Sequence, residues 1–198
     1  MAQAIAAPIA ALPEGMNIPR KRWTRDECRR LMELGILEEA RFELVHGEII
    51  LKMTQHERHV FTCRQVQQAL AAIFGADHVR MAAPIAVGDH EEPEPDAAVM
   101  TRTGRDYLQR GTPPPQDVRL AVEVSDSTLR FDRVVKRGQY AGADIPEYWV
   151  VDINARALHV FRQPVAGDYA AEATLTAADL VGPLAAPGAV IQVADLLP

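Results

Sequence analysis

The chain has 198 residues, with 21 Lys and Arg against 27 Asp and Glu, and its formal net charge is −6 at pH 7. This length suits one compact domain of about 100–200 residues and excludes two full catalytic domains. Apolar residues make up 48% and charged residues 24% of the chain, which excludes a wholly disordered or low-complexity protein. Because the net charge is negative, any binding of nucleic acid must depend on a local basic surface.

Cysteine usage and hydropathy predict the compartment. Cys28 and Cys63 are the two cysteines; they form no CxxC motif, which favours a reducing compartment and gives no support for zinc held by thiolates. No apolar run approaches the about 18 residues of a membrane span, and the first residues lack the basic region of a secretory signal. We therefore expect a cytoplasmic protein that does not associate with a membrane.

The N-terminal third predicts a tail, a helix and a hairpin. Residues 1–20 are Ala-rich and interrupted by prolines, so we expect a flexible tail before a single domain over 21–198. Thr24 and Glu27 form a capping-box pattern, which predicts a helix from about Arg25 to Met32 or Leu34. The apolar residues on either side of His46-Gly47 then predict two strands joined by a tight turn.

The rest of the chain predicts a mixed sheet with helices against it. Helices are expected over His59–Phe74 and Asp132–Ala141, and strands over Val79–Val87, Asp96–Met100, Val118–Val124, Glu147–Asp152 and Ala157–Phe161. The segment Leu175–Pro198 shows no usable pattern. This order indicates an α/β (α+β) fold rather than strict βαβ alternation, and the chain carries neither a GxGxxG nor a P-loop motif.

Two carboxylates stand at positions where burial is costly. Asp96 follows Pro95 at the start of one predicted strand, and Glu123 lies inside the apolar run of another. A carboxylate in such a place is a satisfied structural group or binds a cation. Two of them on neighbouring strands would suit Mg²⁺, which prefers oxygen ligands and often takes one or two protein carboxylates together with phosphate oxygens.

Lys136 is the candidate cation. It follows Glu123 by 13 residues, and it shares one face of a predicted helix with Asp132 and Tyr140 at four-residue spacing. Its ammonium could reach back to the end of the strand. The alternative is a surface ion pair between Asp132 and Lys136, worth a few tenths of a kcal/mol.

Several segments between Arg41 and Phe161 together resemble one family. These are FELVHGEI from Phe42, His59, EPD from Glu94, EVSDST from Glu123, DRVVK from Asp132 and IPEYWVVD from Ile145. In their order and spacing they are similar to the Uma2 family, whose members are regarded as endonucleases and resemble the PD-(D/E)XK nucleases. The resemblance implies a restriction-endonuclease-like mixed β-sheet core flanked by helices.

The resemblance also implies a metal site. Asp96 and Glu123, with the backbone carbonyl of Val124, would bind Mg²⁺ or Mn²⁺. Lys136 would orient or deprotonate the attacking water, since the position where the nucleases usually carry lysine is Ser125 here. Glu43 would complete the metal shell or hold a water, unless it is a solvated strand carboxylate.

Two further residues have supporting roles by the same resemblance. His59 could contact phosphate or protonate the leaving oxygen, although a histidine at a helix N-terminus is more often a polar cap. Tyr140 would support Lys136 or simply pack. The basic residues between Arg20 and Arg30 could contact phosphates or form a solvated helix face.

We therefore expect a metal-dependent endonuclease that hydrolyses phosphodiester bonds in DNA, acting as a homodimer so that paired sites cut both strands. Loops such as Thr101–Asp117 would read the substrate, because no helix-turn-helix is evident. The alternatives are an inactive nuclease-like scaffold that binds nucleic acid or a protein, and a nuclease for RNA or branched DNA.

Overall fold

The computed structural model describes residues 19–37, 42–52 and 54–198, so most of the predicted N-terminal tail lies outside the described residues. The elements are α1 (Arg25–Glu33), β1 (Phe42–Val45), β2 (Glu48–Leu51), α2 (Glu57–Phe74), η2 (Ala76–His78), β3 (Val79–Met81), β4 (Ala97–Met100), α3 (Gly104–Arg110), η3 (Pro115–Asp117), β5 (Val118–Ser125), α4 (Leu129–Phe131), η4 (Asp132–Lys136), α5 (Arg137–Gly142), β6 (Glu147–Asp152), β7 (Ala157–Val165), β8 (Asp168–Thr176), β9 (Leu180–Val181), β10 (Ile191–Gln192) and η5 (Val193–Leu196).

A six-stranded mixed sheet forms the centre of the fold. Its strand order is β3-β4-β5-β6-β7-β8. Only the β5–β6 pair is parallel, and the chain crosses between these two strands through α4, η4 and α5. The expected α/β (α+β) fold with a mixed sheet flanked by helices is confirmed.

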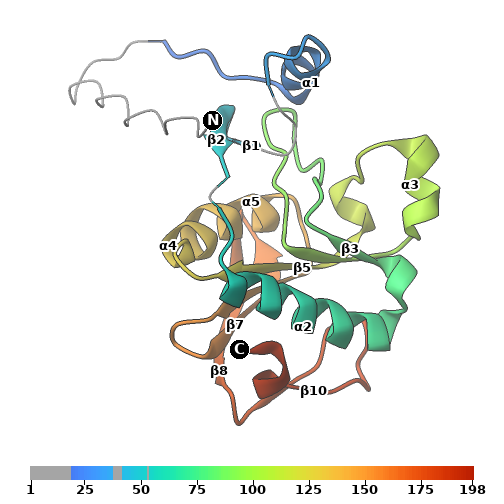
Figure 1. The fold of residues 1–198 in the computed structure, drawn as a ribbon, viewed down its shortest axis with the longest axis vertical. Helices are drawn as coiled ribbons and strands as arrows, with labels where there is room; N and C mark the ends of the chain where they lie inside the picture. Colours follow the sequence, from blue (N-terminus) through green and yellow to red (C-terminus); the bar gives the residue numbers. More distant parts are fainter. Residues whose placement is uncertain (1–18, 38–41, 53) are drawn as a thin grey trace.

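The sheet is buried on both faces, which makes three layers. Helix α2 covers one face, where Val66 and Leu70 pack against Trp149 and its neighbours. The α4–α5 segment covers the other face, where Tyr140 packs against Tyr148. Figure 1 shows α2 and the α4–α5 segment on opposite sides of the strands. Strand alternation therefore sends Glu123 and Ser125 toward the α4–α5 layer, while Val122 and Val124 face α2.

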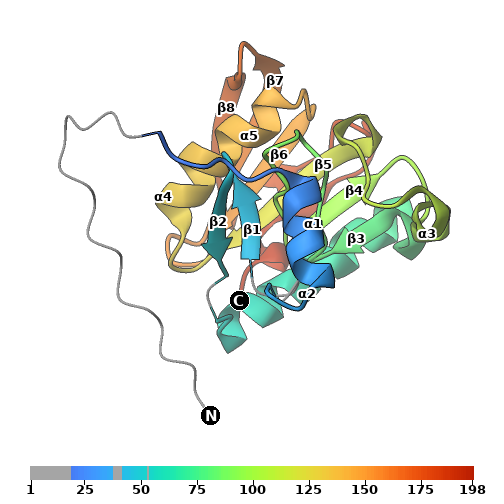
Figure 2. The same cartoon turned by 90° about the horizontal axis from the view of Figure 1, so that it is seen from above.

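The N-terminal elements form a cap over the α5 side of the sheet. Thr24 and Glu27 make the predicted capping box at the start of α1. The β1–β2 hairpin turns at His46 and Gly47, which both have positive φ (51° and 79°), as a two-residue type I′ turn requires. Viewed from above, the hairpin lies between α1 and α4 (Figure 2).

Two predicted strand and loop assignments are wrong. The strand expected over Val79–Val87 ends at Met81, because Ala82 has a positive φ of 39° and residues 82–87 continue as an irregular segment with Ile85 buried. The segment Thr101–Asp117, interpreted as a loop, contains α3, whose N-terminus is capped by Thr103 and Asp106.

The helix expected over Asp132–Ala141 is longer and contains an irregularity. It begins at Leu129, and residues Asp132–Lys136 form a π-helical turn between α4 and α5. The backbone N–H of Arg137 accordingly donates to the carbonyl of Asp132, five residues earlier. Single π turns inside α-helices insert one extra residue and often occur at functional sites.

Candidate active site

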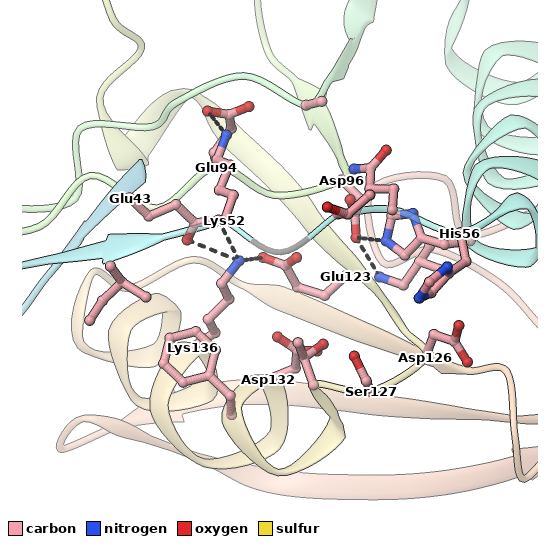
Figure 3. A pocket seen from close by; sticks show the side chains of 18 of the residues that line it. Glu43, Lys52, His56, Glu94, Asp96, Glu123, Asp126, Ser127, Asp132 and Lys136 are labelled. Atoms are coloured by element: carbon pink, nitrogen blue, oxygen red, sulfur yellow. Dashed lines mark hydrogen bonds and ion pairs between the residues drawn. The ribbon is translucent and has the colours of Figure 1, made fainter. Parts of the chain in front are cut away.

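A pocket of about 220 Å³ lies where the β1–β2 hairpin, the start of α2, the end of β5 and the α4–η4 segment meet. Its lining includes the carboxylates of Glu43, Glu94, Asp96, Glu123, Asp126 and Asp132, together with the ammonium groups of Lys52 and Lys136 (Figure 3). His59 and Val124 also line the pocket. The structure thus brings together the metal ligands and the lysine expected from the sequence.

Lys136 is held between two of these carboxylates. Its Nζ lies 2.8 Å from Oε1 of Glu123 and 3.1 Å from Oε1 of Glu43, and its side chain is 6% exposed. Burial alone would lower the pKa of Lys136, but the attraction of Glu123 and Glu43 outweighs it and the net shift is upward. The ammonium is therefore charged, and it cannot accept a proton from water in this state.

The surface ion pair predicted as the alternative for Asp132 and Lys136 does not form. Both residues are buried, and among the described contacts Lys136 pairs with Glu123 and Glu43. The carboxylate of Asp132 instead accepts hydrogen bonds from the hydroxyls of Ser125 and Thr128. The two side chains have other partners, because Lys136 bonds to Glu123 and Glu43 while the hydroxyls of Ser125 and Thr128 occupy Asp132.

Glu123 is a deeply buried acid of the pocket. It is 4% exposed, and its Oε1 accepts hydrogen bonds from Lys136 and from the hydroxyl of Tyr140, which lies 2.7 Å away. Burial raises the pKa of Glu123; the Lys136 ammonium opposes this shift, and three neighbouring carboxylates add to it. Tyr140 does not line the pocket and reaches it only through Glu123.

Asp96 lies directly before β4 and is fixed through one oxygen. Its Oδ2 accepts a hydrogen bond from the backbone N–H of Val124 at 2.8 Å and lies 3.3 Å from Nε2 of His59. His59 is therefore not a polar cap of α2, whose N-cap is His56 without a side-chain hydrogen bond. Burial lowers the pKa of His59, but Asp96, Asp126 and Asp132 together raise it, and the net shift is upward.

These residues fit a hard divalent cation. Oε2 of Glu43 is buried and has no hydrogen-bond partner among the described residues, although it lies 3.1 Å from Lys136 Nζ. Oδ1 of Asp96 also makes no hydrogen bond within the described part of the chain. Six carboxylates line the pocket with two ammonium groups and two imidazoles, and such an excess of negative charge favours Mg²⁺ or Mn²⁺ bound by oxygen ligands.

Sequence reasoning missed one part of the site, the buried cluster of Asp132, Ser125 and Thr128. Its members stand at the junction of β5 and α4 and hold the turn that follows Glu123. The four-residue spacing of Thr128 and Asp132 was a visible signal. Asp132 also stands four residues before Lys136, however, and that spacing favours an ion pair between Asp132 and Lys136 over a bond to Thr128.

The basic residues near the N-terminus mostly have partners within the protein. Lys21 pairs with Glu27, Arg25 with Glu92 and Arg29 with Asp26. Arg22 donates to the carbonyl of His46 and so supports the hairpin turn. This arrangement favours a structural role for these side chains over phosphate binding.

Comparison with known proteins places the chain in a family. Its residues 26–194 match the Uma2 family, described as "Putative restriction endonuclease". No curated protein matches the chain.

A solved structure has a similar fold. It is the crystal structure of "a putative nuclease belonging to DUF820" from Anabaena variabilis ATCC 29413, with a TM-score of 0.64 and 17% sequence identity; the match covers 87% of this chain and 96% of that one. Within the described residues, no helix is both long and apolar enough to cross a membrane. The family match extends over most of the chain and confirms the resemblance seen in its motifs: this protein belongs to the Uma2 family.

Proposed function

We propose that this protein is a metal-dependent endonuclease that hydrolyses phosphodiester bonds in DNA. The observation that carries the proposal is the meeting of Asp96, Glu123 and Lys136 in one pocket, with the ammonium bonded to the carboxylate. The match to the Uma2 family and the similarity in fold to the DUF820 protein support the same class of chemistry.

The proposed ligands come from three segments of the chain. Asp96 through its Oδ1, Glu123 through its carboxylate and Val124 through its backbone carbonyl would hold Mg²⁺ or Mn²⁺. Such an ion supplies Lewis acidity toward a phosphate oxygen and lowers the pKa of bound water. Glu43 would accept a hydrogen bond from water through its unpartnered Oε2.

The protein's own groups then act on the charge that develops at phosphorus. The water oxygen forms a new bond to phosphorus and gives up one proton, and the leaving sugar oxygen gains one proton as its bond to phosphorus breaks. Lys136, which is charged in this site, would offset the negative charge on the phosphate oxygens rather than deprotonate the water. His59 would hold Asp96 in place through their 3.3 Å contact, and Tyr140 would hold Glu123.

The test is cleavage by the purified protein of supercoiled plasmid, linear duplex, single strands, a branched junction and RNA, with Mg²⁺, with Mn²⁺ and with chelator. We expect metal-dependent cutting of DNA that Glu123→Gln abolishes. The matched control is Glu48→Gln, because Glu48 is a largely exposed acid of the hairpin that does not line the pocket.

Each other outcome has a defined meaning. Cleavage of RNA alone, or of the branched junction alone, would mean that the substrate is not ordinary duplex DNA. The proposed hydrolysis of phosphodiester bonds would still hold. Absence of cutting on every substrate, together with no calorimetric binding of Mg²⁺ or Mn²⁺, would overturn the proposal and favour a nuclease-like binding scaffold.

We further propose that the active form is a homodimer, because one such site cuts one strand and two paired sites would cut both. Sedimentation velocity with and without duplex DNA tests this. A monomer that makes only single-strand nicks in plasmid would contradict it.

A further inference from the structure

Helix α2 presents two metal-ligating side chains on one face beside the pocket. His59 and Cys63 are four residues apart, and this spacing places side chains on the same side of an α-helix. Sγ of Cys63 lies 3.4 Å from Nδ1 of His59. His59 lines the pocket and Cys63 does not.

Asp96 supplies a third ligand from a different segment. One ligand atom from each of His59, Cys63 and Asp96 can be chosen so that all three lie within 4.8 Å of one another. In a tetrahedral zinc site with bonds of about 2.0–2.3 Å, neighbouring ligand atoms are about 3.3–3.8 Å apart. The contact of His59 with Cys63 (3.4 Å) and that with Asp96 (3.3 Å) each have such a length, but they use different nitrogens of the ring.

The imidazole in this structure turns a different nitrogen to each neighbour, Nδ1 to Cys63 and Nε2 to Asp96. Chelation of one ion by all three residues therefore needs the side chains to move closer together than the 4.8 Å within which their ligand atoms lie. Burial raises the pKa of the Cys63 thiol, so the thiol is protonated until an ion displaces its proton.

The chemistry of this set differs from that of the oxygen ligands in the pocket. A thiolate, an imidazole and a carboxylate suit thiophilic ions of the Zn²⁺ class and not Mg²⁺. Three protein ligands leave a fourth position for water. We propose that His59, Cys63 and Asp96 form a binding site for a thiophilic divalent ion such as Zn²⁺, which shares Asp96 with the oxygen ligand set of the pocket.

The proposed site has a consequence for activity, and this part depends on the proposed nuclease function. Oδ2 of Asp96 now accepts the hydrogen bond of Val124 N–H. A thiophilic ion on the His59 side would draw this oxygen away and reorient the carboxylate that Mg²⁺ needs. We therefore expect such an ion to inhibit cleavage.

The binding experiment uses Co²⁺ as the probe, because a cobalt–thiolate bond gives a charge-transfer absorption band in the near ultraviolet. We expect wild type to develop this band with one equivalent of Co²⁺ and to lose it on addition of Zn²⁺. Cys63→Ser should abolish the band and weaken Co²⁺ binding by at least about tenfold. Cys28→Ser is the matched control, since Cys28 is the other cysteine, is buried in α1 and belongs to no such cluster.

Several results would overturn the site: no thiolate band in wild type, a band that survives in Cys63→Ser, or a band lost in Cys28→Ser. Far-ultraviolet circular dichroism is the control for folding: a spectrum of Cys63→Ala that matches wild type would show that loss of the thiol does not unfold the protein. A hydrogen-bonded Cys63–His59–Asp96 chain with a purely structural role would show stability changes and no cobalt band.

A second experiment, which measures cleavage, distinguishes failure of the proposed metal site from failure of the proposed nuclease function. Glu123→Gln should lose cleavage and keep the cobalt band, because Glu123 is not one of the three ligands. Zn²⁺ at low concentration should inhibit Mg²⁺-dependent cleavage by wild type and by Cys28→Ser, with at least tenfold weaker inhibition of Cys63→Ser. If no variant cleaves any substrate, the cobalt titration alone decides the metal site.

Discussion

The ammonium of Lys136 lies 2.8 Å from Oε1 of Glu123, and both side chains are almost completely removed from solvent. The pair joins the third strand of the sheet to the helix that follows it. Because the buried ammonium also contacts Glu43 in the hairpin, one cation connects three elements of the fold. The same contacts that hold the hairpin over the sheet therefore build the candidate active site.

Lys136→Met should destabilise the protein by about 3–5 kcal/mol, because it leaves Glu123 and Glu43 buried without their cation. Urea unfolding at neutral pH measures this loss. Combining it with Glu123→Gln should recover part of the stability, since the stranded charge is removed. Lys21→Met, which breaks an exposed pair with Glu27, should change little. Equal stability of Lys136→Met and wild type would contradict the buried pair.

Tyr140→Phe should cost about 1–3 kcal/mol, because Glu123 loses the hydroxyl that donates to it at 2.7 Å. Its cleavage rate should fall as well, because Glu123 is then less firmly held. Tyr148→Phe is the matched control: Tyr148 is equally buried beside Tyr140, but its hydroxyl donates to the carbonyl of Asp132. Both variants should lose stability, and only Tyr140→Phe should lose activity beyond that expected from unfolding. Equal rates for the two would argue against a role for the Glu123 contact.

Mg²⁺ or Mn²⁺ should raise the melting temperature. An ion at a hundred times its Kd stabilises the folded state by about 2.7 kcal/mol, which corresponds to a rise of roughly 5–10 °C for a chain of this size. Asp96→Asn and Glu123→Gln should reduce the rise, while Asp26→Asn, an exposed acid of α1, should not. Differential scanning fluorimetry with and without chelator measures this rise in melting temperature. A rise unchanged in Asp96→Asn would exclude Asp96 as a ligand.

Asp132→Asn should stabilise the metal-free protein at neutral pH. Burial raises the pKa of Asp132 despite the ammonium of Lys136 and the hydroxyls of Ser125 and Thr128. For an acid whose pKa is higher in the folded state, stability is complete below the unfolded pKa and declines as pH rises through the folded pKa. The advantage of Asp132→Asn should therefore shrink as pH falls from about 8 to about 4. Urea unfolding across this range, with chelator present, would contradict the prediction if the difference were independent of pH.

Local pattern predicted the elements that have a strong periodic or capping signal. The Thr24–Glu27 box predicts α1, and the alternation around His46-Gly47 predicts the hairpin and its turn. Helix α2 and strands β4 to β7 also appear within a few residues of their expected bounds. Helix α3 carries a comparable signal in Thr103 and Asp106, but the prolines and glycines around it favour a loop, and a loop is what the sequence predicts there.

Other elements depend on tertiary contacts. Strand β8 lies at the edge of the sheet and exposes most of its side chains, so it has no clean apolar alternation to recognise. The π turn at Asp132–Lys136 cannot be read from a 3.6-residue period. The pairing expected between Asp132 and Lys136 does not form, because Glu123 and Glu43 from distant segments hold the ammonium.

For the site, the sequence by itself determined the chemistry that is available: acids in strand positions where they are costly to bury, one lysine after them, and a family pattern that connects them. Only the tertiary structure decided which of them meet. Glu43, Asp96, Glu123 and Lys136 come from four separate segments, and long-range packing of the hairpin, the sheet and the helix brings them to one pocket. It also decided the direction of their pKa shifts, because burial raises the pKa of Glu123 and the neighbouring carboxylates raise that of Lys136.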